Sequence, residues 1–269
     1  MNPSIQRQWA LRPDNRMFKM AVGGVILLLF FWSATAVSTQ NAQLSGMEVA
    51  KNIILGILNP DMGLLLNFTT QGVPFLLLET VCIAFLGTIV GAILAIPLSF
   101  LSATNIVPKL LAVISRFIIM AIRTIPPLIY GLMFIRVTGP GPFAGLLTMS
   151  LCSIGMLTKM YIEAIEDLNT GILESLDAAG CTLFQKIRYG ILPQLIPNFL
   201  SIMLYRFDMN LRDAAVLGLV GAGGIGAPLI FAMNSYRWNQ AGAVLVGLIL
   251  LVLLVEVLSG KIRMKLING

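Results

Sequence analysis

The polar and charged residues with the clearest capacity for chemistry lie within one apolar stretch, residues 194–219. They are Arg206, Asp208, Asn210, Arg212 and Asp213. A charge near the centre of a bilayer is costly unless it is paired or hydrated, so such residues mark a transport path or a structural contact. On a helix with about 100° per residue, Arg206, Asn210 and Asp213 (the first seam) fall within about 60° of arc. Asp208 and Arg212 (the second seam) fall on roughly the opposite face. We expect one seam to face a translocation path and the other to hold the helix to a neighbour; the alternative is that both are structural.

Arg123 is a further candidate for the translocation path. It lies within another apolar stretch, just before Pro126 and Pro127. The prolines remove backbone donors and should kink the helix. A kink beside a buried arginine could frame a gate or an anion path. The alternative, which we favour, is that Arg123 satisfies the carbonyl groups that the prolines free.

Four other charges are expected to pair according to their depth in the membrane. Glu79 and Arg136 lie near the outer ends of their apolar stretches, and Arg116 and Glu256 lie near the inner surface. Each pair could hold neighbouring helices together, because pairing lowers the cost of a charge in the bilayer.

The composition argues against enzymatic chemistry. The chain has no His, the commonest general base and metal ligand, and its three Cys are scattered. We therefore predict no catalytic, metal-binding or cofactor-binding residue. The phosphate-loop motif G-x-x-x-x-G-K-S/T is absent, so this chain cannot be an ATPase. A net charge of +6 could suggest nucleic acid, but the basic residues are distributed as in a membrane topology, so no nucleic-acid partner is expected.

The elements that must position these residues are membrane-spanning helices. Only 11% of the residues are charged, against roughly 25% in soluble domains. Six apolar stretches are each long enough for a hydrocarbon core of roughly 30 Å. They cover about 20–37, 73–103, 110–137, 142–162, 194–219 and 238–257. We predict an all-α membrane protein with six transmembrane helices in the lipid bilayer of the cell membrane.

The distribution of positive charge sets the expected orientation. With the N-terminus inside, twelve Lys and Arg residues fall in inside segments, and only Lys51 and Arg237 fall outside. Both termini are therefore expected to be cytoplasmic. The first span, which contains Ala34-Thr35-Ala36, also resembles a cleavable signal; its removal would leave the other five spans oriented as before.

This topology divides the chain into segments. The expected segments are a cytoplasmic N-terminus (1–19), the first span (20–37), an extracytoplasmic segment (38–72), a core of five spans (73–259) and a cytoplasmic tail (260–269). In the extracytoplasmic segment, a capping box at Ser45 and Glu48 opens a helix that Pro60 ends. That helix either lies at the outer membrane surface or packs on neighbouring spans.

The core includes a cytoplasmic loop, residues 163–193, in which two short helices are predicted. The first ends at Gly180, where glycine permits a left-handed conformation. The second opens at Thr182, whose spacing to Gln185 fits a capping box. Its apolar residues form an exposed ridge flanked by basic residues, which is typical of a docking site for another protein.

Residues 218–226 hold five glycines, which is a poor composition for a continuous helix. We expect a turn or broken helix at the outer mouth, where a delivering protein could dock. The candidate turn residues are Gly221, Gly223, Gly224 and Gly226. The alternative is close helix packing through small residues. The spacing also fits the dinucleotide motif G-x-G-x-x-G, but no strand precedes it.

The cytoplasmic loop resembles that of the permease subunits of ATP-driven, binding-protein-dependent importers. Glu174, Gly180, Leu192 and Pro193 stand at positions of the loop signature of that family. Ser175 and Leu176 replace its two alanines, and Gly190 stands where Ile is expected. The resemblance implies a type I ABC importer permease architecture in which this loop fits a groove on a separate ATPase. The coupling residues would be Glu174, Asp177, Ala178, Ala179, Gly180, Leu183, Phe184, Leu192 and Pro193.

Further motifs are similar to those of the phosphonate-type permeases. They are Arg123-Thr124-Ile125-Pro126-Pro127, the segments 139–145 and 205–212, and the glycine-rich segment 218–226. The resemblance implies import of phosphonate or a related small phosphorus oxyanion such as phosphite. It also implies a homodimer of permeases, two ATPases that use ATP and Mg²⁺, and an extracytoplasmic solute-binding protein. A permease for another small solute, or a secondary transporter, is the alternative.

Overall fold

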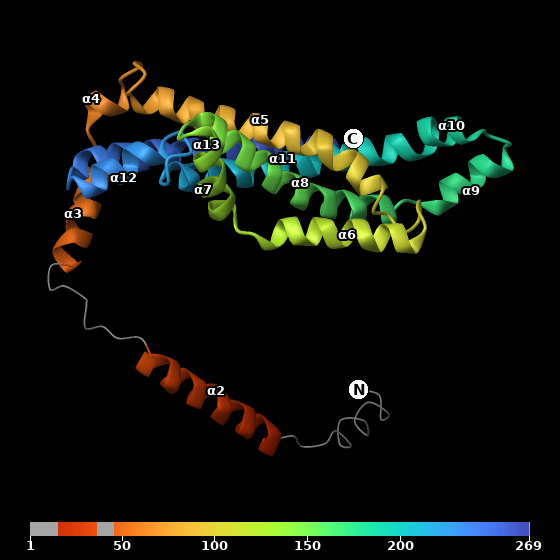
Figure 1. Cartoon of the computed structure of the whole chain (residues 1–269), viewed down its shortest axis with the longest axis horizontal. Coiled ribbons are helices and arrows are strands. Elements are labelled where there is room, and N and C mark those ends of the chain that lie inside the picture. Colours follow the sequence, from red (N-terminus) through yellow and green to blue (C-terminus); the bar gives the residue numbers. More distant parts are fainter. Residues whose placement is uncertain (1–15, 37–45, 269) are drawn as a thin grey trace, which may run out of the picture. The chain divides into compact units, whose positions relative to one another are not determined.

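The computed structural model describes residues 16–36 and 46–268, which form helices and connecting loops (Figure 1). The chain divides into two compact units, residues 1–50 and 51–269. The first unit contains α2 (Arg16–Ala36), whose large apolar side chains are exposed. At 1.5 Å per residue, its 21 residues extend about 30 Å, enough to cross the hydrocarbon core. The first expected span is therefore a helix, as predicted.

Two long helices, α5 (Val73–Phe100) and α8 (Pro142–Glu166), form the central pair of the second unit. Glycine brings them close together: a Cβ on Gly91 would collide with the side chain of Ser153. Small residues allow membrane helices this close approach, and packing between them then supplies the attraction.

The third expected span consists of two helices, α6 (Lys109–Thr124) and α7 (Pro127–Thr138), bent by 82°. Pro126 and Pro127 stand at the break, so the expected kink is confirmed. Both helices pack against α8.

By length and composition, four described helices could cross a membrane: α2, α5, α8 and α13 (Trp238–Asn268). The bent pair α6–α7 makes a possible fifth. The expected fifth span is α11 (Leu192–Gly218). Its 27 residues are long enough to cross a membrane, but it is more polar than these helices and carries Arg206, Asp208, Arg212 and Asp213. It packs against α5, α8 and α13, and lies among the apolar helices.

The two ends of this bundle differ. The connection between α8 and α11 extends at one end as α9 (Thr170–Ala178) and α10 (Leu183–Lys186) (Figure 1). At the other end lie α4 (Met62–Leu65), α12 (Gly226–Asn234) and the start of α13.

The helix expected in the segment before α5 is α3 (Gly46–Leu58). Ser45, its predicted capping residue, lies outside the described residues. The later part of α3 packs on the start of α13, because a Cβ on Gly56 would collide with the backbone of Trp238 and one on Gly242 with the backbone of Gly56. Of the two alternatives, this contact favours packing on a neighbouring span.

Candidate functional site

The connection between α8 and α11, which is the predicted cytoplasmic loop, forms a helical hairpin (residues 167–191). Its first arm is α9 (Thr170–Ala178). The Asn169 side chain accepts from the Gly171 N–H at 3.0 Å and caps the helix. After the helix, Gly180 has φ +73° and donates its N–H to Asp177 O at 2.9 Å. Cys181 N–H donates to Leu176 O at 3.0 Å, which completes a Schellman-type termination. The predicted helix end at Gly180 is confirmed.

The second arm of the hairpin opens with the predicted capping box. Thr182 N–H donates to Gln185 Oε1 at 2.8 Å, and Gln185 N–H donates to Thr182 Oγ1 at 3.5 Å. The expectation of a separate short helix is wrong, however. The helix α10 (Leu183–Lys186) passes through a π-helical turn, η1 (Ile187–Ile191), directly into α11.

The π-turn has a physical reason. Pro193 has no N–H and would crowd the carbonyl four residues earlier in a regular helix, and the wider turn relieves that clash. The Gln194 side chain donates to Gly190 O at 2.7 Å and accepts from Asn169 N–H at 3.1 Å. The hairpin is thus joined to α11 at its base, and a displacement of the hairpin would act directly on α11.

The outer surface of the hairpin carries the residues predicted to couple to a partner. Phe184 is 70% exposed. Lys186 forms an ion pair with Asp177 across the two arms. The other predicted coupling residues whose side chains are described are exposed as well: Glu174, Asp177, Ala178, Ala179, Gly180, Leu192 and Pro193.

The first seam of α11 is buried between α5 and α8. Asn210 donates to Thr88 Oγ1 at 2.8 Å and to Ser153 Oγ at 2.7 Å. Arg206 Nε donates to the same Ser153 oxygen at 3.4 Å. Arg206 is 4% exposed and Asn210 is 0% exposed. Asp213, whose side chain is 38% exposed, lies 4.0 Å from the Arg206 guanidinium. The predicted grouping of these three residues is confirmed, and Arg206 and Asn210 hold α11 to α5 and α8.

The second seam faces away from that network. Arg212 Nη2 lies 3.1 Å from Asp208 Oδ2 and 3.2 Å from Glu256 Oε2 on α13. The side chains of Arg212 and Glu256 are 48% and 60% exposed. The predicted Arg116–Glu256 pair is therefore wrong, because Arg116 pairs with Glu166 instead. Arg116 Nε also donates to Ser102 O, beyond the end of α5, whereas Arg212 and Glu256 lie near the level of Asn210. Glu256 is deeper than expected because α13 continues to Asn268.

Arg123 does not satisfy the freed carbonyls, so the favoured prediction for it is wrong. The Ile122 carbonyl, whose helical partner would be the N–H that Pro126 lacks, accepts from the Tyr130 hydroxyl at 3.0 Å. Arg123 lines a hollow of about 220 Å³ between α6 and α8. Gly155 leaves room for its aliphatic stem, since a Cβ there would lie 2.7 Å from Arg123 Cγ.

Arg123 has neither an ion pair nor a side-chain hydrogen bond within the described ranges. The other two cations of its hollow are paired: Arg116 with Glu166, and Lys159 with Glu163 at 3.4 Å. The hollow therefore has a net positive charge that comes from Arg123.

The glycine turn (residues 219–225) separates α11 from α12, as predicted. Gly221, Gly223 and Gly224 have φ of +95°, +83° and +73°, a left-handed region that favours glycine. Gly226 is the first residue of α12, and its approach to Gly218 leaves no space for a side chain. The close-packing alternative therefore applies at this position as well.

Helix α5 anchors the glycine turn. Gly224 N–H donates to Glu79 Oε1 and Ile225 N–H to Thr80 Oγ1, both at 2.9 Å. The predicted Glu79–Arg136 pair is absent among the described residues. Sequence reasoning missed this contact, because a carboxylate can accept from a backbone N–H 145 positions away, which no spacing rule reveals.

Comparison with known proteins gives a consistent result. The family model described as "Binding-protein-dependent transport system inner membrane component" matches residues 87–262. The phosphite transport system permease protein PtxC of Stutzerimonas stutzeri is 34% identical over 188 residues, which cover 70% of this chain and 68% of that protein. The putative phosphite transport system permease protein HtxC of the same organism is 30% identical over 269 residues, 100% of this chain and 93% of that protein.

Solved structures show the fold. A chain of the inward-facing MetNI methionine ABC transporter aligns with a TM-score of 0.61 at 23% identity, over 71% of this chain and 94% of that chain. The expected permease architecture is thereby confirmed.

Proposed function

This chain belongs to the family of binding-protein-dependent transport system inner membrane components, and on that premise we propose that it lines a path for the import of a phosphorus oxyanion. A member of this family is a multi-pass membrane permease subunit and not an enzyme. A separate subunit hydrolyses ATP.

The substrate class is supported by the relatives. Two proteins that match most of this chain are named as phosphite transport permeases. A phosphite, phosphonate or similar oxyanion is small and negatively charged, and the unpaired Arg123 could attract such an ion as it passes.

The observation that carries the proposed path is the depth of the second seam. Thr88 lies near the middle of the 28-residue α5 and accepts from Asn210. Asp208 and Arg212 are two residues from Asn210 on either side, so they lie within about 3 Å of the same depth. The charges of Arg212 and Glu256 are exposed on the bundle surface near mid-membrane, and the largely buried Asp208 pairs with Arg212 beneath them.

Charges at that depth are not stable against lipid, so water or protein must cover them. We assign the second seam to a water-filled path closed by a second copy of the permease. In the first seam, Arg206 and Asn210 are already buried within one chain, and they hold α5, α8 and α11 together.

The two ends of the bundle fit the other partners of such an importer. The exposed hairpin offers Phe184 and the Gly180 bend to a cytoplasmic ATPase, and its continuity with α11 would carry a displacement to both seams. The glycine turn, at the opposite end, would face the solute-binding protein outside the cell.

The test compares single variants in proteoliposomes that contain the permease, its ATPase and its binding protein. Arg212→Gln should leave assembly intact and lower ATP-driven phosphite uptake by about tenfold or more, the effect of about 1.4 kcal/mol on a barrier. Arg206→Gln, the matched control on the same helix, should instead reduce the amount of assembled complex. If both variants reduce assembly equally, both seams are structural and the proposed path is wrong.

A further inference from the structure

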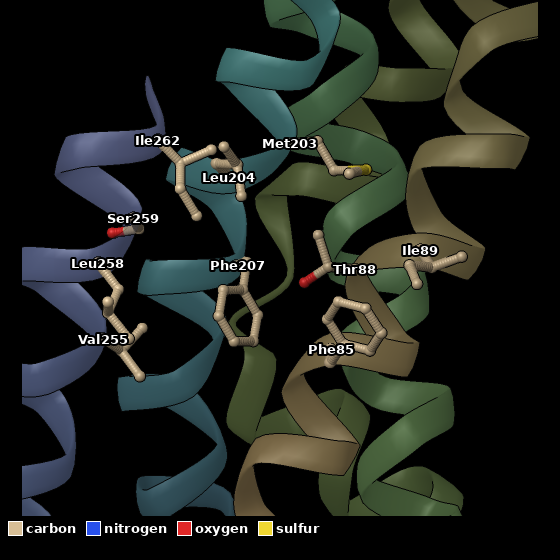
Figure 2. A pocket seen from close by; sticks show the side chains of 10 residues that line it. All are labelled: Phe85, Thr88, Ile89, Met203, Leu204, Phe207, Val255, Leu258, Ser259 and Ile262. Carbon is tan, nitrogen blue, oxygen red and sulfur yellow. The ribbon is translucent and has the colours of Figure 1, made fainter. Parts of the chain in front are cut away.

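A groove runs along the bundle beside the second seam. Figure 2 shows it with α5 on one side, α13 on the other and α11 between them. The volume of the groove is about 300 Å³. Its walls are mainly hydrocarbon side chains, among them Phe85, Phe207, Val255, Leu258 and Ile262.

Two hydroxyl groups also line the groove, but their donors are already used. Thr88 Oγ1 donates to Ala84 O at 2.6 Å, and Ser259 Oγ donates to Glu256 O at 3.3 Å. An apolar ligand could therefore enter without leaving a buried donor unpaired.

The groove is elongated along the bundle. On α13 its lining extends from Val255 to Ile262, a rise of about 10 Å. Hydrocarbon side chains line it over this length, so an unbranched hydrocarbon chain lying along the bundle would contact apolar groups throughout.

One end of the groove meets a basic surface. From the level of Thr88, near mid-membrane, it runs toward the hairpin end of the bundle. The 31 residues of α13 extend about 46 Å, well beyond a hydrocarbon core of about 30 Å. The last turns of α13 therefore reach the level of the lipid headgroups.

Three basic residues surround the open end. Ile262 lines both the groove and an adjoining hollow between Lys261 and Lys265. Ser259 borders a second hollow that contains Arg263, whose guanidinium lies 5.9 Å from the Tyr205 ring centroid. No carboxylate pairs with these three cations in the parts of the chain that the structure describes.

We propose that this groove binds one acyl chain of an anionic phospholipid, whose phosphate lies at Lys261 and Lys265, which share one face of α13 beside the groove. The apolar walls select the hydrocarbon, and the basic cluster selects the negative headgroup. The site adjoins the second seam, because Leu204 and Ser259 line both the groove and the hollow that contains Asp208, Arg212 and Glu256. It does not depend on which solute is transported.

Photolabelling of the full-length permease complex tests the site. Phosphatidylglycerol and phosphatidylethanolamine, each with the same photoreactive acyl chain, are compared in nanodiscs, and labelled peptides are mapped by mass spectrometry. Phosphatidylglycerol should label segments 85–89 and 255–262 preferentially. The exposed double variant Lys261→Gln, Lys265→Gln should lower that labelling at least about five-fold, the loss expected for one basic residue at a membrane surface.

The control is Lys109→Gln, which removes an exposed basic residue at the same end of the bundle on α6 and should leave labelling unchanged. Equal labelling by the two lipids, or a double variant that labels like the parent, would overturn the proposal. So would disulfide cross-linking of Leu258→Cys between two permease copies, since a second copy would then fill the groove.

Discussion

Replacement of Ser153 by alanine tests the structural role of the first seam. Ser153 Oγ accepts from both Asn210 and Arg206 in a fully buried position, so the change leaves two donors without this acceptor. Side-chain hydrogen bonds between membrane helices contribute about 0.6 kcal/mol on average, and a buried unsatisfied donor costs about 1–3 kcal/mol. We expect a loss of about 1–2 kcal/mol.

The assay is thermal unfolding of the purified permease in detergent, where a loss of this size lowers Tm by about 2–8 °C for a chain of this length. Ser150→Ala is the matched control, one turn away on α8. Its hydroxyl donates only to Leu146 O of its own helix, at 2.8 Å, and its loss should be nearly neutral. Equal shifts for the two variants would show that the buried network does not hold the helices together.

Three further predictions follow from single contacts. Gly180→Ala forces alanine into φ +73°, which costs about 1 kcal/mol of stability, and should weaken cross-linking of the hairpin to the ATPase. The control Gly260→Ala, at an uncrowded helical position, should stabilise the permease slightly. An equal effect of the two variants on stability and cross-linking would contradict the reasoning. Gly91→Leu cannot fit against Ser153 and should abolish accumulation of folded permease, as measured by detergent chromatography, whereas Gly24→Leu on the exposed α2 should not. Glu79→Ala removes the acceptor for Gly224 N–H and should speed hydrogen exchange across the glycine turn. Glu79→Gln keeps an acceptor oxygen and should change the exchange rate less. Identical exchange rates in the two variants would argue that the Glu79–Gly224 contact is not maintained.

The helices were largely predictable because hydropathy and local chain chemistry decide them. Gly180 ends α9, the Thr182–Gln185 box opens the next helix and Pro126-Pro127 breaks the third span, each through interactions within a few residues. Helical periodicity also separated the two seams of α11 correctly, since 100° per residue fixes which side chains share a face.

The partners across the bundle were less predictable. Depth suggested Arg116 with Glu256, but Glu256 lies deeper than expected because α13 continues to Asn268, and the actual pairs are Arg116–Glu166 and Arg212–Glu256. Ser153 was missed as the acceptor beneath Arg206 and Asn210. The glycine stripe at Gly87 and Gly91 could have indicated the close α5–α8 contact that brings Ser153 there.

The continuity of α10 with α11 was also missed. The sequence predicted two separate short helices in the loop, whereas a π-turn accommodates Pro193 and Gln194 satisfies a carbonyl nearby. This difference strengthens the coupling proposal, because the second arm of the hairpin and both seams belong to one continuous helical segment.

Phosphite uptake by proteoliposomes that contain the permease, its ATPase and its binding protein tests the central claim most directly. The account predicts uptake that requires ATP on the hairpin side and stops when the partner ATPase is replaced by a hydrolysis-deficient variant. Uptake driven by an ion gradient without ATP would contradict it.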